Sequence, residues 1–275
     1  MITDMDMHHN RKWKSAAEAA GFLVMITLNV LANALPLNGV TTGELSDKYP
    51  NLFVPAGIAF SIWGVIYLLL ACFVAFNLVQ GWRHDPGESQ TEAWPWFFIS
   101  CMANAGWIVA WHNEWLAGSM LIMLLLLASL IVLYYRIRKG SRPVPMKTRW
   151  FVRIPISVYL GWITVATVAN ATALLVSLKW NGFGLSEATW AIVMMLASCV
   201  IGWLALLRRN DFAFVMVLVW ALLGIWIKRH QDVSPGSESV ERMALALFGG
   251  MIAMLVLRTI QLRNERTSPE EADTP

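Results

Sequence analysis

Apolar residues fill most of this chain, in runs long enough to cross a lipid bilayer. The clearest run is residues 154–178, which read IPISVYLGWITVATVANATALLVSL and include no charged residue. At about 1.5 Å per residue, a helix of this length crosses a hydrocarbon core of about 30 Å. Similar runs predict eight membrane-spanning helices, at about 16–36, 54–79, 94–111, 115–135, 154–178, 188–207, 212–227 and 243–262.

Short polar segments separate these runs and close the chain at both ends. Only His112, Asn113 and Glu114 separate the third run from the fourth, so these two predict a tight antiparallel helical hairpin. Residues 1–15 are interpreted as a polar N-terminal tail, and the acidic residues 264–275 as a disordered C-terminal tail.

Composition supports a membrane protein of the all-α class. Hydrophobic residues make up 57% of the chain, charged residues only 14%, and the mean hydropathy is +0.54. Ordinary soluble domains do not have this composition, so we predict a polytopic membrane helix bundle in contact with lipid, with no nucleic-acid partner. Three cysteines lie inside apolar runs and are interpreted as small core residues, without a disulfide or a metal site.

The distribution of positive charge predicts the orientation of the chain. If the N-terminus is cytoplasmic, sixteen of the 21 Lys and Arg residues fall in cytoplasmic segments, with a cluster at 136–153. Cytoplasmic loops of membrane proteins carry this excess. We therefore expect a multi-pass protein of the plasma or inner membrane with both termini in the cytoplasm.

Polar and aromatic residues recur at helical spacing in three of the predicted spans, so each set shares one helix face. An amide facing lipid would be costly, and these faces are therefore expected to look into the bundle. Together they predict an aromatic ligand site in the outer half of the membrane. The candidate residues are Phe60, Trp63 and Tyr67 in the second span, Asn104, Trp107 and Trp111 in the third, and Tyr159, Trp162, Ala166 and Asn170 in the fifth.

Other interpretations of these residues remain open. Asn104 and Asn170 are also suited to bonding each other, or a backbone carbonyl, as polar contacts that hold helices together. The same holds for Asn29 and Asn33, which share one face of the first span. Trp111 lies near a span end, where tryptophan commonly serves as an interfacial anchor.

The sequence contains little that suggests catalysis. His112 and Glu114 are close together but lie on the predicted hairpin turn, and no glycine-rich phosphate loop is present. We identify no buried acidic residue within a span of the kind that proton-coupled transporters use. We therefore predict no catalytic residue, no metal and no required cofactor, and leave enzymatic activity as the least favoured function.

Three motifs resemble the TspO/MBR family, the tryptophan-rich sensory proteins that include the mitochondrial translocator protein. YLGWITVATVAN at 159–170 resembles the fifth-helix motif of that family. WGVIY at 63–67 resembles its second-helix Trp-Gly-x-x-Tyr stretch, and NAGW at 104–107 its third-helix Asn-x-x-Trp element. The resemblance covers about residues 16–180, and the three helices after it, within 181–263, lie beyond the five-helix pattern.

This resemblance implies a five-helix bundle that binds a porphyrin, another tetrapyrrole such as haem, or a sterol-like molecule beneath its first loop. It implies pocket roles for Trp63, Tyr67, Asn104, Trp107, Trp162, Ala166 and Asn170, and a tendency to form homodimers. The first loop departs from the family pattern, because residues 37–53 contain one proline and no tryptophan. We expect a receptor or sensor for a flat hydrophobic ligand; the alternatives are a transporter or permease for such a molecule and a tetrapyrrole-degrading enzyme.

Overall fold

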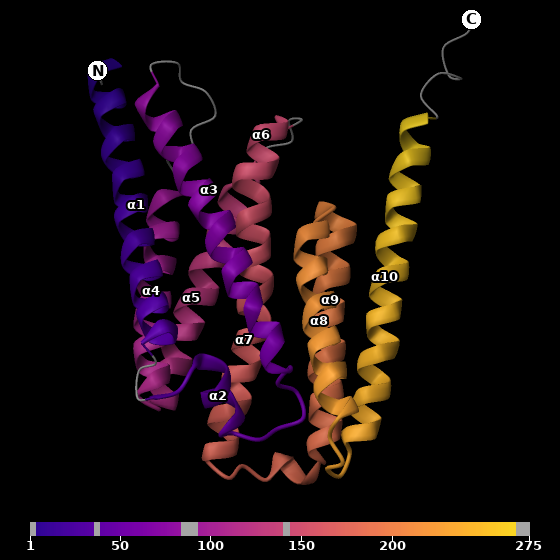
Figure 1. The fold of residues 1–275 in the computed structure, drawn as a ribbon. Coiled ribbons are helices and arrows are strands. Elements are labelled where there is room, and N and C mark those ends of the chain that lie inside the picture. The colour runs from indigo at the N-terminus through magenta and orange to yellow at the C-terminus, as the bar shows by residue number, and fades with distance from the viewer. Residues whose placement is uncertain (1–3, 36–38, 84–92, 140–143, 268–275) are drawn as a thin grey trace, which may run out of the picture. The chain divides into compact units, whose positions relative to one another are not determined.

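The computed structural model describes residues 4–35, 39–83, 93–139 and 144–267, and is helical with no strand in these ranges (Figure 1). Eight of its helices are long and correspond to the eight predicted runs. They are α1 (Asp4–Ala34), α3 (Ile62–Trp82), α4 (Trp94–His112), α5 (Leu116–Arg136), α7 (Ile154–Ser177), α8 (Glu187–Arg209), α9 (Phe212–His230) and α10 (Ser237–Thr267).

The helix ends differ most from the prediction where the chain is polar or contains proline. Helix α1 begins at Asp4, inside the predicted polar tail, and α10 continues to Thr267, inside the predicted disordered tail. Polar residues can extend a helix once its apolar part is packed. The rest of that tail, 268–275, lies outside the described residues.

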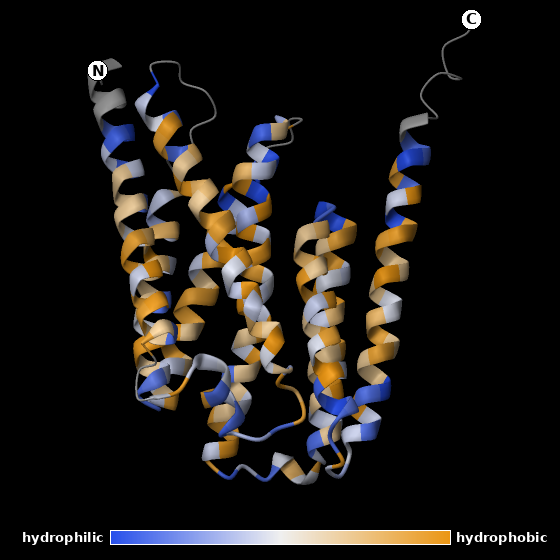
Figure 2. Ribbon diagram, in the orientation of Figure 1, coloured by the Kyte–Doolittle hydropathy of each residue, from blue (hydrophilic) through white to orange (hydrophobic). Residues whose placement is uncertain are grey.

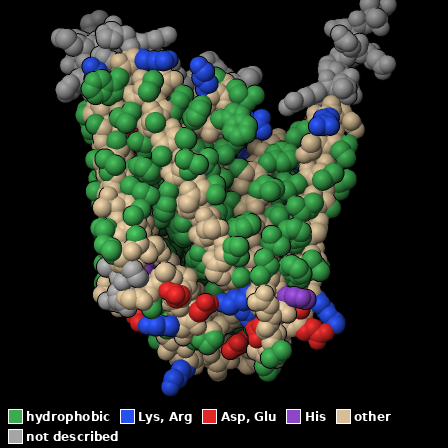
Figure 3. All heavy atoms as spheres, viewed as in Figure 1, with side chains coloured by type: hydrophobic (Ala, Val, Ile, Leu, Met, Phe, Trp, Pro, Cys, Tyr) green, Lys and Arg blue, Asp and Glu red, His purple; other side chains and the backbone are tan. Residues whose placement is uncertain are grey.

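Seven stretches of the described chain are helical, long and apolar enough to cross a membrane. Helix α4 does not qualify, because its tryptophans, Asn104 and His112 lower its hydropathy. Its side chains are largely buried against α1 and α5, so α4 has less need of an apolar surface all round. Figure 2 shows apolar residues along the middle of the helices and polar residues toward their ends. In Figure 3, charged side chains on the face in view gather toward the ends of the helices, and hydrophobic side chains fill the region between them.

The chain forms two compact units, the first comprising residues 1–51 and 60–180. Its long helices form a closed ring in which neighbours pack in the order α1, α4, α5, α7, α3 and back to α1. The predicted hairpin of the third and fourth runs is present as α4 and α5, whose turn places Glu114 at a φ of 53°. Five helices thus surround the three helix faces that carry the predicted site residues, and we call these three sets of residues the stripes.

The start of the basic segment between α5 and α7 is held by contacts within this unit. Arg138 donates from Nη2 to Oγ of Ser157 at 2.7 Å, and its guanidinium lies 3.8 Å from the centre of the Tyr134 ring. Helix α1 starts, and α5 ends, at the same end of the unit as this segment (Figure 1). The cytoplasmic location of that end stays a prediction.

The second unit comprises residues 181–275 together with the short segment 52–59. Helices α8, α9 and α10 each pack against the other two. Ser186 caps α8, Asp211 caps α9, and Asn210 ends α8 in the left-handed conformation at a φ of 50°.

The helix predicted at 54–79 begins later than expected. Residues 54–56 are not helical, and the chain continues through a 3-10 turn at Gly57–Ser61 into α3.

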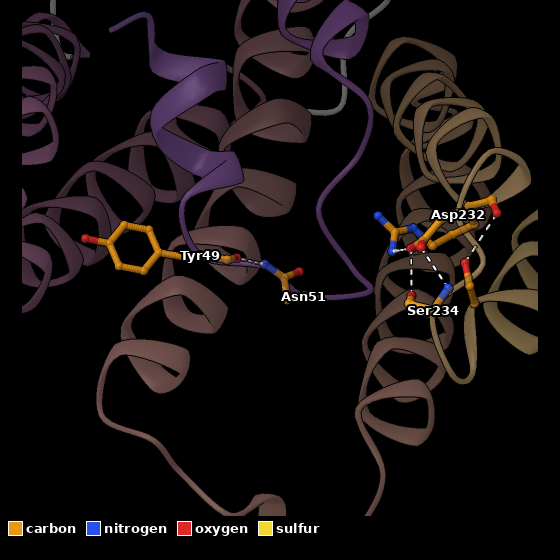
Figure 4. A network of polar contacts seen from close by, with 6 residues as sticks. Tyr49, Asn51, Asp232 and Ser234 are labelled. Carbon is orange, nitrogen blue, oxygen red and sulfur yellow. Dashed lines mark hydrogen bonds and ion pairs between the residues drawn. The ribbon is translucent and has the colours of Figure 1, made fainter. Parts of the chain in front are cut away.

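The turn between α9 and α10 is organised by Asp232 (Figure 4). Its carboxylate accepts hydrogen bonds from the backbone N–H and the hydroxyl of Ser234, at 2.9 and 2.8 Å, and pairs with Arg229. The hydrogen bonds from Ser234 hold the pKa of Asp232 below its usual value. Asp232 therefore stays ionised at neutral pH, the form that accepts these hydrogen bonds and pairs with Arg229.

One expectation about charge is wrong. Glu18 lies inside α1, within a stretch able to span the membrane, and is only 3% exposed. It accepts a hydrogen bond from Nδ2 of Asn77 on α3 at 2.9 Å. The sequence analysis identified no buried acidic residue within a span, but the packing of α1 against α3 buries Glu18.

Candidate ligand-binding site

The three stripes meet inside the five-helix unit, with Trp63 of α3 at their centre. Its ring lies 6.0 Å from that of Trp107 and 5.6 Å from that of Tyr67, both stacked. Tyr159 and Trp162 of α7 meet it edge-on, each at 6.3 Å. The ring of Trp63 thus contacts residues of both other stripes. The sequence pattern predicted which residues share a helix face, but not which rings touch.

The stack continues from Trp107 toward the first loop. Trp107 and Trp111 stack at 6.0 Å with an interplanar angle of 21°, and Trp111 lies 6.4 Å from Tyr49 of the loop. Trp111 is 4% exposed and donates from Nε1 to the Thr42 carbonyl at 3.4 Å. It is therefore packed within the unit under the loop.

Polar side chains link the helices around these rings. Asn170 of α7 accepts from Nε1 of Trp107 at 2.8 Å and donates to Oγ of Ser119 on α5 at 3.1 Å. Asn104 of α4 accepts from Nδ2 of Asn29 on α1 at 2.7 Å. Asn104 and Asn170 do not bond each other, as one interpretation had it, but each holds neighbouring helices together.

One buried donor at the site has no hydrogen-bond partner among the described residues: Nε1 of Trp162. Trp162 is 1% exposed. An unpaired buried donor costs about 1–3 kcal/mol, so native structures seldom keep one without a use. This N–H is suited to donating to an acceptor atom of a ligand.

The first loop includes the short helix α2 (Thr42–Asp47), capped by Thr41 and Glu44 in a reciprocal pair of hydrogen bonds. Asn33 of α1 accepts from the Thr42 hydroxyl at 3.2 Å, and Asn51 donates to the Tyr49 carbonyl at 2.8 Å (Figure 4). The Thr-x-x-Glu spacing at 41–44 is a helix-start signal that the sequence analysis did not use.

The loop is fastened to the α4–α5 turn by Glu114. Its carboxylate pairs with Nζ of Lys48 at 2.7 Å and accepts from the Tyr49 hydroxyl at 2.8 Å. These two hydrogen bonds hold the pKa of Glu114 below its usual value. Burial, with the hydrogen bond to Glu114, raises the pKa of Tyr49 to about 12. Glu114 thus fastens the loop that covers Trp111.

Replacing Glu114 with glutamine should loosen this loop with little loss of global stability, since exposed ion pairs contribute about 0.2–1 kcal/mol. Amide exchange in α2 should rise in Glu114→Gln. The depressed pKa of Glu114 means that its contribution is present above about pH 4.3 and is lost as the pH falls through its lower folded value. The raised pKa of Tyr49 preserves its hydrogen bond until the pH approaches about 12.

Hydrogen exchange, expressed as protection factors, measures this loosening. Glu238→Gln is the matched control, because it breaks the exposed ion pair with Arg242 in α10. Unchanged protection of α2 in Glu114→Gln would show that the ion pair does not hold the loop.

Eight of the ten predicted residues lie in this connected cluster of rings and hydrogen bonds, Phe60 joining it through a 5.9 Å edge-on contact with Trp162, whereas Asn104 bonds Asn29 of α1. Ala166 lies on α7, half-buried, and has no aromatic ring with which to join the stack. The prediction missed Ser119, a lone serine in the apolar α5, and Tyr49, which contacts Trp111 from the loop. Only the packing distinguishes these two from other serines and tyrosines.

The comparisons with known proteins agree with the motifs and extend them. The model of a family described as TSPO-like protein matches residues 15–257. The match includes the three C-terminal helices, whereas the motifs suggested a resemblance ending near residue 180. No curated protein and no solved structure matched the chain. Because the matched segment covers most of the chain, this membrane helix bundle belongs to the family of TSPO-like proteins.

Proposed function

We propose that this protein is a membrane receptor for a flat, largely apolar molecule, a porphyrin-like tetrapyrrole or a sterol, which it binds among the rings of Trp63, Trp107 and Trp162. The single observation that carries the proposal is the buried Trp162 Nε1, which has no hydrogen-bond partner among the described residues. It lies in an aromatic cluster closed by the first loop. The family match is consistent with this proposal, and the choice of ligand is part of it.

The shape and chemistry of the cluster suit such a ligand. Trp63, Trp107 and Trp111 are stacked within 21–27° of parallel, and a planar molecule could replace their mutual contacts with contacts of the same kind. The buried N–H group of Trp162 would donate to a carboxylate, carbonyl or hydroxyl oxygen. Apolar walls with a few aimed polar groups are typical of small-molecule sites.

Transport of the same molecule is a second candidate, favoured by one observation. The buried Glu18, with Asn77 as its hydrogen-bond donor, is an ionisable group within a membrane-spanning stretch. Such groups commonly serve ion-coupled transport. Uptake into vesicles that depends on a proton gradient, and that Glu18→Gln removes, would favour transport over binding alone.

Titration of the purified protein with protoporphyrin and with cholesterol, followed by quenching of tryptophan fluorescence, tests the receptor proposal. Trp162→Phe keeps an aromatic ring but removes the unpaired N–H. It should weaken binding by about tenfold, the loss of one hydrogen bond of about 1.4 kcal/mol. The smaller ring should cost the ligand-free protein some stability, and removal of an unsatisfied buried donor should offset part of that cost.

The loss of affinity, compared with that of a matched control, identifies the role of this N–H. Trp190→Phe is the control, because its indole already donates to the Gly182 carbonyl at 2.8 Å, far from the cluster in sequence. Saturable binding that is unaffected by Trp162→Phe would place the ligand elsewhere. Absence of saturable binding of either ligand would overturn the proposal.

A further inference from the structure

Residues 52–59, which we call the strap, connect the first loop to α3 but pack in the C-terminal unit. Most of their apolar side chains are deeply buried: Leu52 and Phe53 are each 4% exposed, Val54 is 1% exposed and Ala59 is fully buried, whereas Ile58 is 62% exposed. Burial of most of an apolar segment resists its displacement. The strap is therefore held as part of the three-helix unit, although its sequence position is within the family's five-helix core.

Two hydrogen bonds fasten the strap to α9. The backbone N–H of Ala56 donates to the carbonyl of Gly224 at 3.0 Å, and Nε1 of Trp220 donates to the carbonyl of Ala59 at 2.9 Å. Trp220 and Gly224 are four residues apart, so they lie on the same face of α9. One face of one helix thus fixes both the middle and the end of the strap.

Close approach of the strap to α9 requires a glycine at position 224. A Cβ at this position would lie 2.8 Å from the Cβ of Ala59 and 2.9 Å from that of Pro55, closer than side chains tolerate. A larger residue would push the strap away from α9. Gly249 in α10 differs, since nothing lies within 4 Å of the corresponding Cβ.

The strap leads directly into the aromatic cluster. Phe60 follows Ala59, and the 3-10 turn Gly57–Ser61 runs straight into α3, which carries Trp63 in its first turn. Phe60 meets Trp162 edge-on, and Trp63 contacts four other rings. A displacement of Ala59 is passed through a short, helical stretch of backbone to these two rings.

We propose that Trp220 and Gly224 are positioning residues for the ligand site. By holding the strap, they set the positions of Phe60 and Trp63, and the C-terminal helices thereby control the affinity of the aromatic cluster for its ligand. The claim about ligand affinity rests on the proposed function. The claim that these residues control the positions of the rings does not depend on any ligand.

The test compares Gly224→Val with Gly249→Val, each adding the same side chain to a helix of the C-terminal unit. Two properties are measured on the full chain: the near-ultraviolet circular dichroism of the ligand-free protein, which reports coupling between stacked indoles, and the dissociation constant for protoporphyrin and cholesterol. Gly224→Val should alter the spectrum and weaken binding by about fivefold or more. Gly249→Val should change neither.

Trp220→Phe is the milder variant, because it removes one hydrogen bond and keeps an aromatic ring, and Trp203→Phe on α8 is its exposed control. Trp220→Phe should weaken binding more than Trp203→Phe. A merely structural role would lower the unfolding temperature of the Gly224 and Trp220 variants without changing spectrum or affinity, and that result would overturn the proposal. If the wild type binds neither probe, the receptor proposal fails, and the spectra of the glycine variants still decide whether α9 controls the rings.

Discussion

Replacing Trp63 with alanine should abolish measurable saturable binding of a porphyrin or sterol, the largest effect on binding that we expect from a single substitution. Trp63 contacts Tyr67, Trp107, Tyr159 and Trp162 through its ring. Truncating a central aromatic residue of a binding site commonly costs about 2–4 kcal/mol, which corresponds to a loss of about 30-fold to 1000-fold in affinity. No other ring of the cluster has as many stacked and edge-on neighbours.

The titration of tryptophan fluorescence used for Trp162→Phe measures this loss. Trp115→Ala is the matched control, because Trp115 continues the stripe of α4 beyond the turn but is 65% exposed. A Trp63→Phe variant should retain part of the affinity, since it keeps a ring that can stack. If Trp63→Ala and Trp115→Ala bind equally well, the ligand lies outside the aromatic cluster.

Replacing Asn170 with leucine should produce the largest loss of stability among the polar positions of the first unit. Leucine cannot accept from Trp107 or donate to Ser119, so the Trp107 N–H is left buried without its acceptor, while the Ser119 hydroxyl still donates to the Leu116 carbonyl. A hydrogen bond between membrane helices contributes about 0.6 kcal/mol on average, whereas an abandoned buried donor costs about 1–3 kcal/mol. The second effect dominates, and we expect a total loss of about 2–4 kcal/mol.

The free energy of unfolding in detergent micelles, measured for a set of variants, separates these two effects. Adding Trp107→Phe and Ser119→Ala to Asn170→Leu should recover much of the lost stability, because no polar partner then remains unpaired. Asn113→Leu, at an exposed amide on the α4–α5 turn, should cost little. A triple variant less stable than Asn170→Leu alone would show that ring packing, not the abandoned donor, accounts for the loss.

The sequence by itself determined the membrane class, the helix positions and the shared faces of Trp63, Trp107 and Trp162. A bilayer leaves few choices, because a spanning segment must satisfy its own backbone and match the hydrocarbon thickness. Residues spaced by three and four then fall on one side of a helix whatever its neighbours are. The family assignment followed from the same motifs, and the matched residues 15–257 extend it to the C-terminal helices.

Only the tertiary structure decided which of these residues meet. The bond from Trp107 to Asn170, the pairing of Asn29 with Asn104, and the burial of Glu18 beside Asn77 depend on the order of helices in the ring and on the rotation of each helix about its axis. Local spacing does not contain that information. Packing alone likewise assigns the strap to the C-terminal unit, since Gly224 leaves room for Ala59 only when distant segments of the chain approach each other.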